Sequence, residues 1–159
     1  MKKMRTKTVR ETAVEEAFHE VEPKDLNASD TLFGGELMHH LLDKVGGKVA
    51  QHHSGRVCVT RHAEIDIAAS AYLGETLFFK ASLNRAWESS MEVGMKVTAV
   101  DFQKVTLRYI GNAYVTFVAL DDERRPVAVP AVIPRTLDQK RRYREAEDRR
   151  AFYRRKKKS

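Results

Sequence analysis

The spacing of apolar residues changes along the chain and separates a helical part from a strand part. Between Glu36 and about His52, apolar residues recur at helical spacing and predict one long helix. From Val57 onward the period is two, which predicts strands over residues 57–67, 75–83, 91–99 and 105–120. Strands that follow a single amphipathic helix must cover its apolar stripe. We therefore predict an α+β architecture, with a long central helix wrapped by a curved antiparallel β-sheet.

The two ends of the chain carry weaker patterns. Val14, Ala17, Phe18 and Val21 recur at helical spacing before Pro23 ends the run, and these residues alone leave helix and strand both open. The range 137–158 has helix-forming composition but a thin apolar stripe, which predicts a peripheral helix.

Length and composition narrow the class of protein. A chain of 159 residues most simply forms one domain, and its single cysteine, Cys58, excludes an internal disulfide framework. No window approaches eighteen consecutive apolar residues, so we expect no membrane span, and a cytoplasmic location fits best.

The net charge of +7 is concentrated at one end. Residues 135–159 carry twelve Lys/Arg and four Asp/Glu, a net charge of +8, whereas the rest of the chain carries 17 and 18, a net charge of −1. We divide the chain into a flexible basic N-terminus (1–10), a globular domain (11–134) and a basic C-terminal helical extension (135–159). The extension could attract a nucleotide-bearing ligand, nucleic acid or a membrane, or be a solvated tail. Without a helix-turn-helix pattern, we expect no nucleic-acid partner.

One acid of the predicted helix stands apart from the apolar stripe. At one hundred degrees per residue, Asp43 points away from the face that carries Leu37, Met38, Leu41, Leu42, Val45 and Val49. Gly46 and Gly47 follow within one turn, and each glycine inside a helix costs about 0.5–1 kcal/mol relative to alanine. We expect another group to pack closely there, or to slide in beside the acid.

Several ordered segments together resemble a known family. They are Pro23–Asn27 leading into Thr31–Gly35, then Leu42–Asp43, Val59–Thr60, Gly74–Glu75, Ser89–Val93, Thr116–Ala119 and Val127–Pro130. The chain resembles a single-hotdog acyl-CoA thioesterase of the cytosolic acyl-CoA hydrolase type. The resemblance implies a hotdog fold, an extended segment over residues 12–21, a homodimer whose sheets join edge to edge, and further assembly into a hexamer, a trimer of dimers.

The same resemblance implies roles for particular residues. Asp43 would be the general base or nucleophile, and Asn27 would position water or substrate across the dimer interface. Ser89 and Ser90 match the family's hydroxyl-bearing segment at the active site. Our own physical inference is that backbone N–H groups near Gly34 and Gly35 hold the oxyanion, because unpaired donors gather at a helix start. The substrate would be acyl-CoA, the products a fatty acid and CoA, and no cofactor beyond that CoA is implied.

Other chemistries have less support in the sequence. Six histidines include no His-x-x-x-His pair, so we expect no metal site, and no G-x-S-x-G turn supports a Ser/His/Asp triad. A non-catalytic acyl-CoA-binding hotdog sensor is the main alternative, and a hotdog dehydratase is a third. Asn27 and Asp43 favour the hydrolase. The chain departs from the family pattern at Asp30 and at Ala86–Glu88, where glycine is usual.

Overall fold

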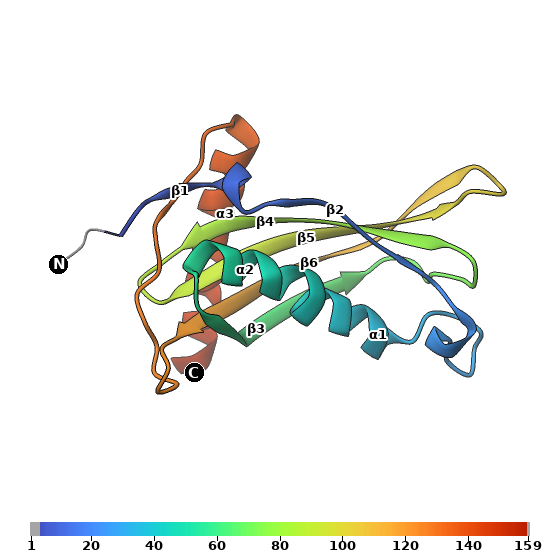
Figure 1. Cartoon of the computed structure of the whole chain (residues 1–159), viewed down its shortest axis with the longest axis horizontal. Coiled ribbons are helices and arrows are strands. Elements are labelled where there is room, and N and C mark those ends of the chain that lie inside the picture. Colours follow the sequence, from blue (N-terminus) through green and yellow to red (C-terminus); the bar gives the residue numbers. More distant parts are fainter. Residues whose placement is uncertain (1–3, 159) are drawn as a thin grey trace.

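The computed structural model describes residues 4–158, without the side chains of residues 15 and 16. Its centre is a five-stranded, fully antiparallel sheet in the order β2-β4-β5-β6-β3. Figure 1 shows a helical segment across one face of the twisted sheet and the C-terminal helix on the other. The predicted α+β hotdog architecture is confirmed. The strands are β2 (Val14–Glu20), β3 (Val57–Ile67), β4 (Thr76–Ala86), β5 (Ser90–Asp101) and β6 (Thr106–Leu120).

The central helix is one continuous run made of three pieces. It consists of α1 (Gly34–His39), a π-helical segment η3 (His40–Gly46) and α2 (Gly47–Ser54), and it ends at Gly55 in the left-handed conformation. The helix therefore starts two residues before the predicted boundary and ends two residues after it. Its buried apolar stripe is Leu37, Leu41, Val45 and Val49. Met38, predicted on the same face, is 45% exposed because it lies at the edge of that stripe.

Gly46 and Gly47 allow the helix to pack closely. A Cβ on Gly46 would lie 2.5 Å from the carbonyl oxygen of Leu41 and 2.8 Å from Cε of Met95 on β5. A Cβ on Gly47 would lie 2.8 Å from the carbonyl oxygen of Leu42. The close neighbours are thus the π-helical backbone and the sheet. The alternative, that a group slides in beside Asp43, is not what the two glycines accommodate in this chain.

The two faces of β5 meet different helices. Met91, Val93, Met95, Val97 and Ala99 are buried on the side of the central helix, as the alternation predicted. The opposite side carries Ser90 and Glu92, which hydrogen-bond to the C-terminal helix α3 (Leu137–Lys158). The sheet therefore separates two layers of helix. Within a single chain, the described polar side chains on one face of the sheet do not contact those on the other face.

The first apolar segment is a strand. β2 pairs with β4, and the register moves from Val14↔Ala81 to Ala17↔Phe79, so three steps on β2 match two on β4. This bulge places Val14 and Ala17 on the same side of the sheet. Their spacing of three residues, which looked helical, comes from the bulge, and the extended conformation implied by the family resemblance is confirmed.

The strand β3 lies at an edge of the sheet. The period-two pattern predicted a half-buried strand, but Val57, Val59 and Ile67 are 61%, 39% and 51% exposed. A register shift between Thr60 and His62 turns the strand partway along its pairing with β6. A second register shift lies in the β5–β6 pairing, next to Ile110.

Helix α3 packs against the sheet mainly through polar and aromatic side chains. Among the residues that the structure describes, Ala146 is its fully buried member. The guanidinium of Arg85 lies 4.0 Å from the Tyr143 ring centre, and Arg149 lies 3.7 Å from that of Tyr114. These contacts make α3 part of the folded unit and exclude the solvated-tail alternative for this helix.

The N-terminal segment is more ordered than expected. Met1–Lys3 lie outside the described residues, but β1 (Lys7–Thr8) pairs in parallel with β7 (Val132–Ile133), and Val9 is buried. Two short 3₁₀ turns, Val9–Glu11 and Pro23–Asp25, flank β2. Lys7, Thr8 and Val9, which the sequence analysis assigned to the N-terminal segment, therefore contact the globular domain in this structure. None of the described helices is long and apolar enough to cross a membrane.

Candidate active site

Asp43 lies on η3, on the side of the central helix that faces away from the sheet. Its side chain is 73% exposed in the single chain, and its Oδ2 lies 3.2 Å from Nδ1 of His39, one turn earlier. The apolar stripe holds the helix on the sheet and thereby directs this carboxylate outward. The predicted orientation of Asp43 is therefore observed, and any enclosure of its side chain requires a second molecule.

Asn27 closes the loop that precedes the helix. Its Oδ1 accepts hydrogen bonds from the backbone N–H groups of Ser29, at 2.9 Å, and Thr31, at 3.2 Å, while its Nδ2 donates to Thr31 Oγ1 at 3.0 Å. Asp30, in the place of the usual glycine, adopts a left-handed φ of 57°. Asn27 thus shapes this turn, and no hydrogen bond in the described part of the chain joins it to Asp43.

Gly34 and Gly35 form the first residues of α1. The carbonyl oxygen of Phe33 accepts hydrogen bonds from Glu36 and Leu37, and none of the described hydrogen bonds uses the N–H groups of the two glycines. A Cβ on Gly34 would meet nothing within 4 Å, whereas one on Gly35 would collide with the Phe33 ring. Both glycines are exposed, so an incoming carbonyl group can approach their donors.

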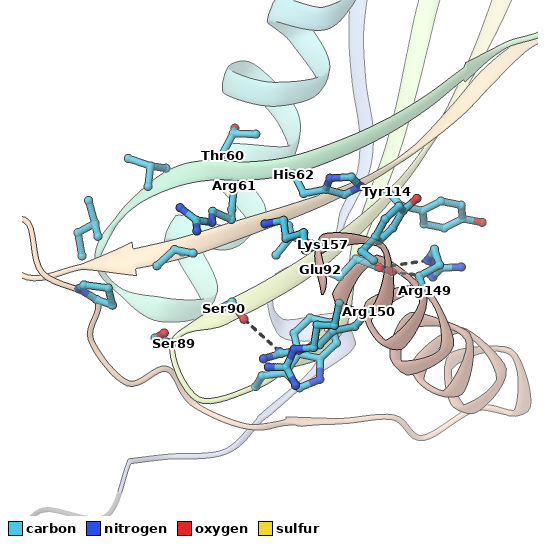
Figure 2. A pocket seen from close by; sticks show the side chains of 18 of the residues that line it. Thr60, Arg61, His62, Ser89, Ser90, Glu92, Tyr114, Arg149, Arg150 and Lys157 are labelled. Carbon is cyan, nitrogen blue, oxygen red and sulfur yellow. Dashed lines mark hydrogen bonds and ion pairs between the residues drawn. The ribbon is translucent and has the colours of Figure 1, made fainter. Parts of the chain in front are cut away.

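Ser89 and Ser90 lie on the opposite side of the sheet. They line a cavity of about 680 Å³ between β3, the start of β5, β6 and α3 (Figure 2). Ser90 Oγ accepts a hydrogen bond from Arg150 at 3.2 Å. Asp43, Asn27, Gly34 and Gly35 are not among the residues that line this cavity. The single chain therefore brings the two serines together and keeps them apart from the helix acid.

The cavity is strongly basic. Figure 2 shows Arg150 and Lys157 reaching over it from α3, and Arg61 from β3. Burial and the neighbouring Arg154 lower the pKa of Arg150. Such a shift is what surplus positive charge in a partly enclosed space produces. The cationic residues of the wall are Arg61, Arg124, Arg149, Arg150, Arg154 and Lys157.

Hydroxyl and aromatic groups complete the wall. Thr60 from β3 lies in the same cavity as the two serines, and Trp87 covers one side with its indole 4.3 Å from the Arg150 guanidinium. Tyr153 donates a hydrogen bond to Glu64, and burial together with this bond raises the pKa of Tyr153 to about 12. The tyrosine is therefore a neutral donor at physiological pH.

Most of the residues that line this cavity were not predicted from the sequence. The helical positions 149, 150, 153, 154 and 157 follow i, i+4 rows and therefore share a face, a signal that was available in the sequence. That this face turns toward Thr60 and the two serines could not be read from spacing, because α3 has almost no apolar stripe to orient it.

Cys58 and Trp87 both contact neighbouring elements. Cys58 is half-buried with its Sγ 3.3 Å from Ser54 Oγ, and burial raises the pKa of its thiol. A half-buried thiol with a raised pKa is packed rather than reactive. Trp87 donates from its indole N–H to Glu147 of α3 at 2.8 Å and so contributes to helix docking.

Comparison with known proteins matches this fold and sequence to one family. The model of the thioesterase superfamily matches residues 30–105. A Bacillus subtilis protein named uncharacterized acyl-CoA thioester hydrolase YkhA is 31% identical over 118 residues, which are 74% of this chain and 68% of that protein. The chain belongs to the thioesterase superfamily.

Other members of the superfamily extend the comparison. Mouse acyl-coenzyme A thioesterase 11 is 33% identical over 133 residues, 78% of this chain, but the chain spans only 21% of that protein's length. A hexameric acyl-CoA thioesterase superposes with a TM-score of 0.90 at 25% identity, covering 96% of this chain and 97% of that one. The Staphylococcus aureus acyl-CoA hydrolase, solved with butyryl-CoA and CoA, gives a TM-score of 0.85 at 32% identity, covering 97% and 95%.

Proposed function

We propose that this thioesterase-superfamily protein hydrolyses acyl-CoA to a free carboxylic acid and CoA, with Asp43 as general base or nucleophile. The observation that carries the proposal is an exposed carboxylate on the central helix of a hotdog fold whose relatives are named acyl-CoA thioester hydrolases. The S. aureus hydrolase has been solved as alanine variants of an aspartate, a threonine and an asparagine. These are the residue types of Asp43, Thr60 and Asn27.

The proposed reaction uses groups that the helix and its preceding loop provide. As general base, Asp43 takes a proton from water while the water oxygen adds to the thioester carbonyl carbon. The carbonyl oxygen becomes negative and accepts hydrogen bonds from the N–H groups of Gly34 and Gly35. Collapse of this intermediate breaks the C–S bond, and the CoA sulfur receives the proton held by Asp43. As nucleophile, Asp43 would instead add to the carbonyl carbon and expel CoA thiolate as the C–S bond breaks, which forms a mixed anhydride. Water would then hydrolyse the anhydride to the free acid and the Asp43 carboxylate, and its remaining proton would pass to the thiolate.

A second subunit is part of the proposal. β3 is an eleven-residue edge strand whose outer backbone groups and apolar side chains offer a pairing surface. Pairing two copies of β3 would join the sheets edge to edge and bring a partner chain toward the exposed Asp43. A carboxylate that loses contact with water becomes a stronger base. The homodimer is therefore the minimal active unit, and the hexameric neighbour supports a trimer of dimers.

The basic cavity supplies a place for the CoA moiety. CoA carries phosphate groups and an adenine ring, which suit arginine clusters and aromatic faces such as that of Trp87. Thr60, Ser89 and Ser90 add hydroxyl donors at the same wall. The cationic face of α3 is thereby assigned to the substrate, and a nucleic-acid partner is not part of this proposal. The rat relative is named a cytosolic hydrolase, which supports a cytoplasmic location.

The test is release of free thiol from a panel of acyl-CoAs of increasing chain length. We expect release by the wild type, loss of at least about a hundredfold in rate with Asp43→Asn, and a smaller loss with Asn27→Ala. Asp122→Asn, an exposed aspartate in the loop after β6, is the matched control and should keep full rate.

Two outcomes would contradict the proposal in different ways. Binding of a non-hydrolysable acyl-CoA analogue without thiol release from any substrate would favour the sensor alternative. Full activity of Asp43→Asn would leave the hydrolase in place and remove Asp43 from its mechanism.

A further inference from the structure

A second cluster of polar side chains lies where β2 passes the beginning of the central helix. His19 comes from β2, Glu36 from α1 and His40 from the first position of η3. Each offers one possible ligand atom, and these atoms lie within 4.8 Å of one another. The spacing of the histidines along the chain predicts no metal site. Only the fold brings His19 to the Glu36–His40 pair.

His40 points to a shared ligand. Its side chain is 7% exposed, and its Nε2 is buried without a hydrogen-bond partner among the described residues, although Glu36 Oε1 is 3.2 Å away. A buried polar atom left unpaired costs about 1–3 kcal/mol. Two ligands of a tetrahedral zinc ion, with bonds of 2.0–2.2 Å, lie roughly 3.3 Å apart. The nitrogen and the carboxylate oxygen therefore have the separation of two ligands that face one ion.

Asp25 and Phe79 hold the two histidine rings in place. His19 Nε2 lies 2.8 Å from Oδ2 of Asp25, a buried carboxylate that also accepts the N–H of Glu22 at 2.9 Å. A carboxylate that accepts Nε2–H leaves Nδ1 as the ligating nitrogen, which is the usual support of metal-bound histidine. The His40 ring is stacked on Phe79, with ring centres 5.4 Å apart and planes at 16°.

We propose that His19, Glu36 and His40 bind a divalent transition-metal ion, for which Zn²⁺ is the best match, with Asp25 holding His19 in the ligating tautomer. Two imidazoles and one carboxylate suit zinc and disfavour Mg²⁺ and Ca²⁺, which prefer oxygen ligands. The ion fastens β2 to the start of the central helix. Because Asn27 follows Asp25 by two residues and Asp43 follows His40 by three, it also fixes the loop and the helix of the proposed active site.

The first experiment needs no variant. Protein freed of metal with EDTA and dialysed is titrated with Zn²⁺ by calorimetry, and with Co²⁺ by visible absorption. We expect one ion per chain, a Co²⁺ spectrum of a four-coordinate site with nitrogen ligands, and a rise in melting temperature that EDTA reverses. Mg²⁺ at the same concentration should leave the melting temperature unchanged. Absence of one-to-one uptake of both transition metals would overturn the proposal.

The variants test which residues bind the ion. His40→Gln and Glu36→Gln should each weaken Zn²⁺ binding by at least about tenfold, and Asp25→Asn by about 10–100-fold. Glu36 is partly exposed, so its variant retains the fold even where a buried change does not. His52→Gln removes an exposed histidine outside the cluster and is the matched control. Unchanged affinity in Glu36→Gln and His40→Gln would refute the assignment. Metal uptake is measured independently of thiol release. It therefore tests the metal site even if the protein does not hydrolyse acyl-CoA.

Discussion

Glu92 on β5 and Arg149 on α3 form a buried ion pair that joins the sheet to the C-terminal helix. Arg149 donates from NH2 to Glu92 Oε1 at 2.6 Å and from Nε to Oε2 at 3.1 Å, and Asn84 donates to Oε1 at 2.9 Å. Both side chains of the ion pair are less than one-fifth exposed. The pair is the central polar contact of a helix that buries little apolar surface, and it stands at the wall of the basic cavity.

Removing one partner of this pair should destabilise the protein strongly. Arg149→Met leaves the Glu92 carboxylate buried without its counter-charge, and we expect a loss of about 3–5 kcal/mol in the free energy of unfolding, measured with urea. Arg149→Met combined with Glu92→Leu should recover most of that loss. Arg155→Met, on an exposed part of α3, serves as the control. A double variant no more stable than the single one would show that the pair does not act as a unit.

The charge of Arg150 should be needed for binding the substrate. Arg150→Gln removes a cation from the cavity together with the charge-assisted hydrogen bond to Ser90, so KM for acyl-CoA should rise about tenfold while kcat changes little. Arg144→Gln removes the same charge from an exposed part of α3. Steady-state kinetics at two salt concentrations measure both effects. Equal KM values for the two variants would contradict the placement of CoA phosphates in this cavity.

The close packing at Gly46 should make alanine costly there. Gly46→Ala introduces a Cβ at 2.5 Å from the Leu41 carbonyl oxygen and 2.8 Å from Met95, and we expect a loss of about 1–3 kcal/mol in the free energy of unfolding. Gly34→Ala meets open space, so stability should stay the same or rise by up to about 1 kcal/mol. Urea denaturation of both variants measures these free energies of unfolding. If Gly46→Ala were as stable as the wild type, the helix would be able to move away from β5.

Stability should fall on acidification before the carboxylates titrate. Burial, and to a smaller extent the nearby Lys7, lowers the pKa of His53, whose Nε2 lies 2.7 Å from the Pro130 carbonyl oxygen. The unfolded chain binds this proton more readily, so stability is lost as pH falls below about 6.5, by at most about 1.4 kcal/mol per pH unit. Asp121, whose pKa is lowered by the N–H of Arg125, adds its loss only below about pH 3.8.

The variant His53→Gln isolates this effect. It should flatten the dependence of the unfolding free energy on pH between 6.5 and 5 while leaving the slope at lower pH intact. Urea denaturation at several pH values measures the slopes. An unchanged slope in the variant would assign the acid sensitivity to other groups.

The edge strand β3 should control assembly and activity together. Val59→Lys places a charge on the exposed edge proposed to pair with a partner, so the oligomer should dissociate and thiol release should fall with it. Val105→Lys changes a residue that is 88% exposed in the β5–β6 turn and should alter neither. Light scattering with size-exclusion chromatography gives the mass of both variants. A fully active Val59→Lys monomer would contradict a site shared between subunits.

The strands and the central helix could be predicted because their apolar residues repeat with a clear period. The alternation of Met91, Val93, Met95, Val97 and Ala99 predicted the buried face of β5, and the helical stripe correctly directed Asp43 outward. β2 was ambiguous, since a bulge between Val14 and Ala17 produced a spacing that a helix also has. The candidate site residues could be named from the sequence and stay a prediction, but the distribution of Asn27, Asp43 and Ser90 over two faces of the sheet could not be read from it.

The sequence by itself determined the central helix, the four strands that follow it and the α+β class, and it named the candidate catalytic residues, because local periodicity and ordered motifs are properties of neighbours along the chain. Only the tertiary structure decided which distant side chains share a cavity: Thr60, Ser90 and Arg150 on one face, and His19 with His40 on the other. Whether such distant side chains come together depends on the strand order, on a bulge and on the docking of a helix with almost no apolar stripe. The physical reason is that α3 is held by ion pairs and by guanidinium groups over aromatic rings, whose partners lie more than thirty residues apart in the chain.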